Sequence, residues 1–335
     1  MDLLHYPLSR RIGEWPIQII QWLPDSQRVL LVQDDETDKE KIEVFNPEAG
    51  NLRVYATRDV GREPPAWLAG LNALIYPSEE RVISTGNQYQ RKLWATFGDP
   101  KSAQLLENST VFDMPYAYSV VVKPDGSRFA YRAPDGTQFF RRDGTLATLP
   151  AIAFDPAEWD YRGEIGIYVS TYAMSWRPGA SQIFIFSYAD GSSNTGYTFL
   201  LDSNTGQLCE LNFDGKATTS GLWSQNGRYL DTDSAVLDAA TGKLYSESGF
   251  AWAPDNRHLL SIGYCPVAGC QSGGSMSLID FLSGEIDPVL PTDLFKVDRY
   301  GMLNPAVFAW SPDGSKVLAL CADDNLCMIS VQVTK

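Results

Sequence analysis

The sequence predicts an all-β fold built from repeated four-stranded antiparallel sheets, and two turn motifs carry this prediction. The first is the segment 310–320, WSPDGSKVLAL, in which a Trp-ended strand meets a Pro-Asp-Gly turn and then a run of β-forming residues. Proline presets φ for a turn, Asp can bond its own backbone, and Gly accepts positive φ. This motif occurs seven times, so the chain is expected to form a seven-bladed β-propeller.

The seven copies of the motif extend over almost the whole chain. They lie at positions 22, 67, 122, 176, 223, 252 and 310, and the copy at 67 is degenerate. The interval between copies varies, and we assign the variation to loops, where repeat proteins accept insertions. We therefore expect residues 1–335 to form a single propeller domain.

The second motif is a hairpin turn within the repeats. The segment 238–243, DAATGK, is echoed at 202–207 and at 280–285. A Gly at the left-handed position of a three-to-five-residue hairpin loop explains the pattern. Together with strands expected at 16–22, 28–32, 42–45 and 52–55, it predicts one four-stranded meander per repeat.

The two ends of the chain are expected to pair. The last repeat has strand candidates at 317–320 and 326–331 but no fourth strand, whereas the candidate at 3–6 stands apart from the first repeat. Pairing these segments would close the ring and remove exposed sheet edges.

The Trp-x-Pro-Asp-Gly element followed by an Ile/Leu/Val run resembles the repeats of TolB-like and WD-repeat-like β-propellers, over roughly residues 15–330. The Gly-His and Trp-Asp signatures of true WD-repeat proteins are absent, and so is the Gly-x-Ser-x-Gly elbow of an α/β-hydrolase domain. The resemblance implies the fold and says little about function, since propellers host binding, scaffolding and unrelated catalysis.

Composition excludes several partner classes. The net charge is −14 and the pI is about 4.6, which argues against nucleic acid and anionic membranes as partners. No apolar run reaches the length of a membrane span, so we expect no membrane insertion.

The cysteines predict a chain outside the cytosol. Two local disulfides, Cys265–Cys270 and Cys321–Cys327, with Cys209 left over, would suit an extracytoplasmic or secreted protein whose export signal is absent from this sequence. The alternative is five free thiols acting as small hydrophobic residues. Zinc fits less well, because the spacings are unusual and only two histidines are present.

Two long loops, 150–168 and 288–305, are the expected ligand-binding face, opposite the Pro-Asp-Gly turns. Both combine aromatic rings, acids and an Arg, which suits a sugar or peptide. The candidate residues are Trp159, Asp160, Tyr161, Arg162, Glu164, Asp298, Arg299 and Tyr300. The alternative is that the aromatic rings only fasten the loops to the blades.

The sequence favours a non-catalytic binding or scaffolding propeller that recognises a protein, carbohydrate or peptide. A carbohydrate-active hydrolase is the alternative, because glycoside hydrolysis needs two nearby carboxylates. Its candidates are Asp155, Glu158, Asp160, Glu164, Asp293 and Asp298.

No cofactor is expected. The acidic loop 34–40 could gather Ca²⁺, but it lacks the alternating ligand spacing and the Gly of a dedicated loop. Asp231 occupies a strand position that is apolar in other repeats, so we expect a hydrogen-bond partner for it. His258 aligns with Arg28 at the start of a second strand and is expected to be an ordinary exposed residue.

Overall fold

The structure is a computed structural model of the 335-residue chain. It describes residues 5–6, 17–35, 39–59, 64–68, 72–82, 88–97, 103–112, 120–125, 128–132, 138–142, 169–189, 196–205, 207–211, 213, 221–232, 235–262, 275–291, 308–321 and 326–330. The described residues form strands and turns only, and they contain no helix that could span a membrane. The chain divides into two compact units, the first comprising residues 1–57, 228–231 and 235–335, and the second residues 58–227 and 232–234.

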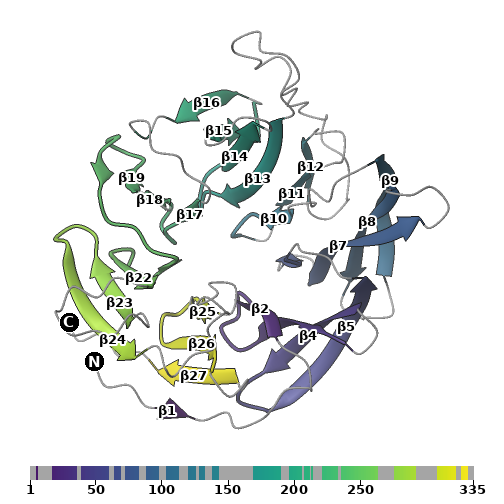
Figure 1. The fold of residues 1–335 in the computed structure, drawn as a ribbon, viewed down its shortest axis with the longest axis horizontal. Coiled ribbons are helices and arrows are strands. Elements are labelled where there is room, and N and C mark those ends of the chain that lie inside the picture. Colours follow the sequence, from purple (N-terminus) through teal and green to yellow (C-terminus); the bar gives the residue numbers. More distant parts are fainter. Residues whose placement is uncertain are drawn as a thin grey trace. The chain divides into compact units, whose positions relative to one another are not determined.

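Three antiparallel sheets belong wholly or almost wholly to the first unit (Figure 1). One contains β2 (Ile17–Trp22), β3 (Val29–Asp34), β4 (Lys39–Asn46) and β5 (Asn51–Asp59). Another contains β21 (Ala251–Trp252), β22 (His258–Ile262), β23 (Ser275–Asp280) and β24 (Glu285–Pro291). The third contains β25 (Phe308–Trp310), β26 (Lys316–Leu320), β27 (Leu326–Ser330) and β1 (His5–Tyr6).

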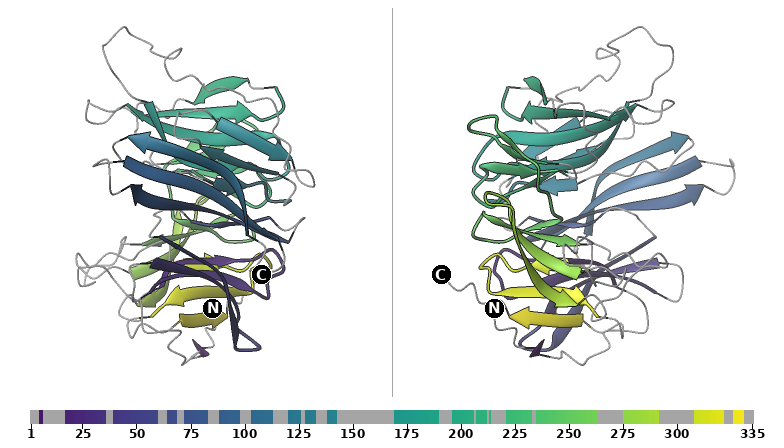
Figure 2. Two further views of the ribbon diagram at one scale, coloured as in Figure 1. Left: turned by 90° about the vertical axis from the view of Figure 1, so that its right-hand side faces the viewer. Right: turned by 60° about the vertical axis from the view of Figure 1, so that its left-hand side comes forward.

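The second unit holds three further sheets, visible in side view in Figure 2. The first consists of β6 (Ala66–Leu68), β7 (Ala73–Val82), β8 (Gln88–Phe97) and β9 (Ala103–Phe112). The next consists of β10 (Val120–Val122), β11 (Arg128–Arg132) and β12 (Gln138–Arg142). The last consists of β13 (Val169–Trp176), β14 (Gln182–Ala189), β15 (Gly196–Asp202) and β16 (Leu208–Leu211).

The boundary between the units passes through one more four-stranded sheet, of β17 (Leu222–Trp223), β18 (Tyr229–Asp231), β19 (Val236–Asp238) and β20 (Leu244–Tyr245). The described residues thus form seven sheets, six with four strands and one, β10–β12, with three. The expected set of seven four-stranded sheets is therefore met in six of them.

The first motif lies in the first strand of each described sheet. The motif position ends that strand in six sheets, as Trp22 ends β2 and Trp310 ends β25, whereas Trp67 is followed by Leu68 in β6. The following turn is closed by a backbone bond, for example from Ser311 N to Lys316 O at 2.8 Å. Gly314 has φ +77°, and Ser26 and Asn256 also take positive φ. The motif therefore specifies a hairpin with a left-handed residue, which is Gly in some copies and a small polar residue in others.

Successive motif turns pack on one another within each unit. A Cβ on Gly314 would lie 2.7 Å from Cγ of Pro254, the proline of the preceding motif. Likewise, a Cβ on Gly227 would lie 2.3 Å from the carbonyl oxygen of Pro178. At both places the glycine is needed for space as well as for its φ.

The second motif forms the hairpin turn that the sequence predicts. The N–H groups of Gly242 and Gly284 donate to the carbonyls of Asp238 and Asp280 at 2.8 and 2.7 Å, and both glycines have φ +73°. Asp202 accepts the N–H of Asn204 at 2.8 Å through its side chain. These aspartates are therefore turn-forming residues.

The N-terminal strand completes the last sheet. β1 pairs antiparallel with β27, in the register His5 to Ile329 and Tyr6 to Met328, as Figure 1 shows. This confirms the expected pairing of the chain's two ends. It places a strand from the start of the sequence at the outer edge of the sheet that contains the last motif.

The core of the first unit lies between its sheets. One apolar cluster joins residues of β2–β4 to residues of β22, β23 and β25–β27, including Trp22, Phe45, Leu260 and Phe308. The indole N–H of Trp22 donates to the carbonyl of Ala309 at 2.8 Å. Because both faces of β3 are covered, Val29 to Val32 are all fully buried, so this strand is a continuous apolar run.

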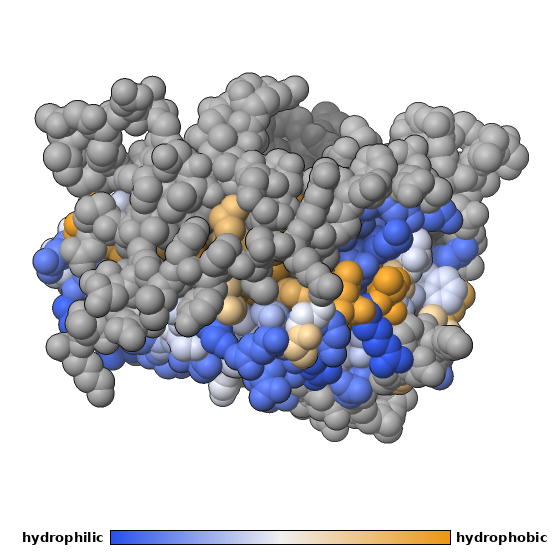
Figure 3. Space-filling model, turned by 90° about the horizontal axis from the view of Figure 1, so that it is seen from below, coloured by the Kyte–Doolittle hydropathy of each residue, from blue (hydrophilic) through white to orange (hydrophobic). Residues whose placement is uncertain are grey.

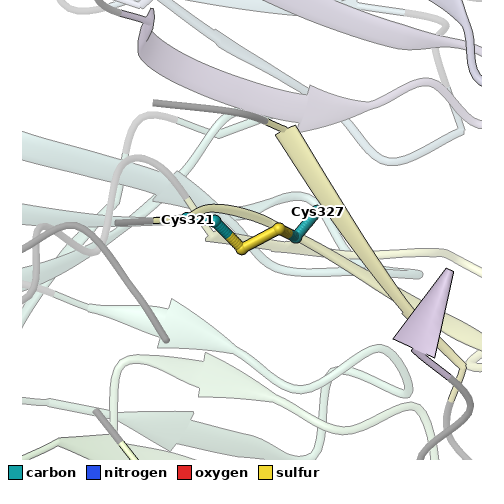
Figure 4. Close-up of a disulfide and its surroundings, with 2 residues drawn as sticks. All are labelled: Cys321 and Cys327. Carbon is teal, nitrogen blue, oxygen red and sulfur yellow. A yellow bond between two sulfur atoms is a disulfide. The ribbon is translucent and has the colours of Figure 1, made fainter. Parts of the chain in front are cut away.

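The predicted disulfide Cys321–Cys327 is present, with the two Cα atoms 5.9 Å apart across the end of the β26–β27 hairpin (Figure 4). Cys209 is free, as expected, and it is exposed. Cys265 and Cys270 lie outside the described residues, so their pairing stays a prediction.

Candidate functional site

The predicted ligand-binding residues lie outside the described part of the chain. They are Trp159, Asp160, Tyr161, Arg162, Glu164, Asp298, Arg299 and Tyr300, and the candidate carboxylates Asp155, Glu158 and Asp293 lie outside it too. The described strands show only where the two segments that contain these residues leave one sheet and enter the next.

Both segments connect the last strand of one sheet to the first strand of the next. The segment 143–168 runs from β12 to β13, and the segment 292–307 runs from β24 to β25. The expected loop 288–305 thus began too early, because residues 288–291 continue β24. Since β13 and β25 each end at a motif turn, both segments enter at the strand end away from that turn. Each segment therefore enters its following strand at the end opposite the motif turn. The segment 143–168, however, leaves β12 at the end beside the turn, because Arg142 pairs with Arg128 at the start of β11. That the two segments form one ligand-binding face stays a prediction.

The acids of the second motif are held by their own hairpins. Asp238 accepts Arg228 Nη2 at 2.9 Å and the N–H of Ala240 at 2.9 Å. The bond from Arg228 is the main reason that the pKa of Asp238 lies below its usual value. Asp238 is only 1% exposed, so it is a buried structural anion.

Asp280 repeats this arrangement one sheet further on. It accepts Arg257 Nε at 2.9 Å, the Ser283 hydroxyl at 2.8 Å and the N–H of Leu282 at 3.0 Å. Burial alone would raise the pKa of Asp280, but these hydrogen bonds outweigh it and hold the pKa well below its ordinary value.

The acids of the first motif are also engaged locally. Asp25 contacts Arg28 Nε at 2.6 Å, and Asp255 contacts the ring of His258 in the same way. The expected alignment of His258 with Arg28 is thus confirmed, although its side chain is only 24% exposed and so is half-buried rather than exposed. Its role is to pair with the turn acid.

Asp231 has the backbone partner that its position calls for. It is 2% exposed, and both carboxylate oxygens accept the N–H of Gly249, at 3.3 and 3.2 Å. A Cβ on Gly249 would lie 2.4 Å from the carbonyl oxygen of Leu260, so the approach of this backbone needs glycine. Asp231 therefore fastens the chain entering β21 to the end of β18.

The acidic loop 34–40 is described only at its two ends. Asp35 donates its N–H to the carbonyl of Lys39 at 2.6 Å and accepts the N–H of Lys39 through Oδ1 at 3.1 Å. Within the described ranges, no three His, Cys, Asp or Glu residues gather as metal ligands. Whether this loop takes Ca²⁺ stays a prediction.

Glu43 in β4 is the acid that the sequence gives no reason to single out. It is 4% exposed, and its Oε2 has no hydrogen-bond partner within the described part of the chain. Burial raises the pKa of this carboxyl, and Lys41 opposes the rise only in part. Glu43 is a candidate proton donor by environment, but a glycosidase-type reaction needs a second carboxyl beside it.

Sequence reasoning also missed a pocket on the sheet β2–β5. Its volume is about 240 Å³, and its lining residues come from the start of β3 and from β4 and β5: Arg28, Val44, Asn46, Asn51, Leu52, Arg53 and Tyr55. The alternation of Arg53 and Tyr55 in β5 places both side chains on one face of the strand, which is the only sequence signal for the pocket.

Comparisons with known proteins show the fold. No protein-family model matches the chain, and no curated protein matches it either. Among solved structures, an oligogalacturonate lyase from Vibrio parahaemolyticus is similar with a TM-score of 0.61 and 8% sequence identity, over 99% of this chain and 97% of that one. The TolB-like and WD-repeat-like resemblance thus rests on the motif alone. The repeated meanders and this structural likeness together show that the chain has a β-propeller fold.

Proposed function

We propose that the chain is a non-catalytic binding propeller: a single seven-bladed domain over residues 1–335. Its ligand-binding face is formed by the segments 150–168 and 292–305. The ligand is a carbohydrate, a peptide or a segment of a partner protein, held by the aromatic rings and charged groups predicted there. No cofactor takes part, and neither nucleic acid nor a membrane is a partner.

One observation favours a binding function over a catalytic one. Acids abound in the chain, but the turn acids of the described part are bound to their own hairpins, and Asp231 to a backbone N–H. A carboxylate with a depressed pKa and a fixed cation partner is a poor general acid. The acids of the described turns therefore serve the fold, and the abundance of acids is no sign of catalysis.

A carbohydrate-active enzyme is the second candidate. It is favoured by the likeness to a solved oligogalacturonate lyase over nearly the whole of both chains. At 8% identity that likeness extends to the fold, so the reaction would have to come from carboxylates in the two long segments, such as Asp160 and Asp298.

An extracytoplasmic location belongs to the same proposal. The disulfide Cys321–Cys327 supports it, since such bonds persist in oxidising compartments. A thiol titration of protein purified without reductant would check this directly. The expected result is that at most three of the five cysteines react, and labelling of all five would contradict it.

Substitutions distinguish the binding function from the enzymatic one. The full chain is first screened by thermal shift against oligogalacturonates, neutral oligosaccharides and short peptides, and the strongest hit is measured by calorimetry. For a binding module, Trp159→Ala and Tyr300→Ala should each weaken affinity by about fivefold or more, because an aromatic contact with the ligand is worth on the order of 1 kcal/mol or more. Asp160→Asn and Asp298→Asn should change affinity by about threefold at most.

Analysis of the products formed from the same ligand tests the alternative, that the chain is an enzyme. If the wild-type chain cleaves the saccharide, and Asp160→Asn or Asp298→Asn abolishes cleavage while binding persists, the chain is an enzyme and the proposal is wrong. If no saccharide or peptide changes the melting temperature, a partner protein is the remaining candidate ligand.

A further inference from the structure

The pocket on the sheet β2–β5 is lined by several hydrogen-bond donor groups. Arg28 and Arg53 supply guanidinium groups, and Asn46 and Asn51 supply amides. Asn46 accepts the N–H groups of Glu48 and Ala49 through Oδ1, at 3.0 and 2.9 Å, so its NH₂ group is the part that can serve a ligand. No Asp or Glu is among the lining residues of this pocket.

Two acids close to this pocket in the sequence are already paired, and Glu43, which precedes Val44, is buried at 4% exposure. Asp25 contacts Nε of Arg28 at 2.6 Å, and Glu48 contacts Nζ of Lys316 at 2.7 Å. A guanidinium has five N–H donors, so Arg28 can serve both Asp25 and a second acceptor. In a chain with net charge −14, this pocket is a local site of positive charge.

The pocket also has apolar lining residues. Val44 and Tyr55 are each 6% exposed, and Leu52 is 42% exposed. Cζ of Arg53 lies 5.4 Å from the centre of the Tyr55 ring, a cation–π contact that holds the guanidinium beside the pocket. Figure 3 shows that exposed hydrophobic residues lie next to strongly hydrophilic ones on the surface seen there.

We propose that this pocket binds a small organic carboxylate with an apolar body. The carboxylate lies between Arg28 and Arg53, whose planar forks match its two oxygens, and the body rests on Leu52 and Val44. The volume of about 240 Å³ suits a ligand smaller than drug-sized compounds. The apolar lining of the pocket distinguishes such a ligand from inorganic phosphate, which guanidinium groups also bind.

The test uses the full chain and three probes measured by saturation-transfer NMR and calorimetry. Benzoate has the carboxylate and the flat body, benzamide lacks the charge, and inorganic phosphate lacks the body. Benzoate should bind at least about tenfold more tightly than either of the others, because it alone uses both the guanidinium groups and the apolar lining of the pocket.

Two variants and one matched control locate the site. Arg53→Gln should weaken benzoate binding by about tenfold or more, and Leu52→Ser should weaken it by about threefold. Lys243→Gln is the control: it also removes a cation, 4.3 Å from the ring of Tyr245, but it lies outside the pocket. It should leave benzoate affinity unchanged.

Several outcomes would overturn this proposal. They are equal binding of benzamide and benzoate, equal binding of phosphate and benzoate, loss of affinity in Lys243→Gln as large as in Arg53→Gln, and no benzoate binding at all. Trp159→Ala should leave benzoate affinity unchanged, so the test is independent of the long-segment ligand site. If Arg53→Gln fails to fold, the result with Leu52→Ser decides.

Discussion

Replacing Gly314 by Ala tests whether successive motif turns pack together. Gly314 has φ +77°, and its added Cβ would lie 2.7 and 2.9 Å from ring carbons of Pro254. The positive φ costs an L-residue about 1–2 kcal/mol. Forcing a methyl group against a proline ring, which cannot swing aside, adds about 1–3 kcal/mol.

Gly242→Ala is the matched control for this substitution. Gly242 has φ +73° and lies in the same compact unit, but its added Cβ would meet no atom within 4 Å. It should therefore cost only the backbone strain, about 1–2 kcal/mol. The difference between the two variants isolates the contact between the turns.

The assay is urea unfolding of both variants and the wild type, followed by tryptophan fluorescence. Gly314→Ala should lower the free energy of unfolding by about 1–3 kcal/mol more than Gly242→Ala does. Equal losses in the two variants would show that the turns do not touch, and the packing of the motif proline on the next glycine would be wrong.

Three further predictions test other features. Deletion of residues 1–8 should lower stability by about 1–3 kcal/mol by removing the strand paired with β27, and an unchanged melting temperature would refute that pairing. Asp231→Ala should lower the free energy of unfolding by about 1–3 kcal/mol, measured by thermal unfolding, because the N–H of Gly249 loses its acceptor. Asp231→Asn, which keeps an acceptor oxygen, should lower it by less. Glu43→Gln should raise the melting temperature at pH 7 and not at pH 4, because an acid whose folded pKa is raised reduces stability only above its unfolded value of about 4.5; the opposite pH dependence would mean that the carboxylate is paired.

Local turn chemistry made most of the fold predictable. A Trp-ended strand before a Pro-Asp-Gly-type turn marks the end of most first strands. The Asp-x-x-Thr/Ser-Gly pattern marks a later hairpin, because its Asp and Gly form the turn through backbone bonds. The lone strand candidate at the start of the chain was informative only because the last repeat lacked one. The same reasoning placed Asp231 against a backbone partner.

Features that depend on how sheets pack were not predictable. Glu43 lies in the sequence Ile-Glu-Val-Phe, whose alternation would put it toward solvent, yet its strand is covered on both faces and the acid is buried. The pocket beside Arg53 is lined by residues of β4 and β5 and by Arg28 before β3, which come together only when these strands pair. A similar cation-x-aromatic pattern at Lys243 and Tyr245 does not line this pocket.

The central claim is that the chain binds a ligand without transforming it, and calorimetry with product analysis on the same sample tests it most directly. The saccharide or peptide that gives the largest thermal shift is titrated into the wild-type chain, and the mixture is then analysed for cleavage. We predict saturable heat of binding, intact ligand after prolonged incubation, and loss of the heat in Trp159→Ala. Cleaved ligand that disappears when Asp160 or Asp298 is replaced by Asn would contradict the claim and establish an enzyme.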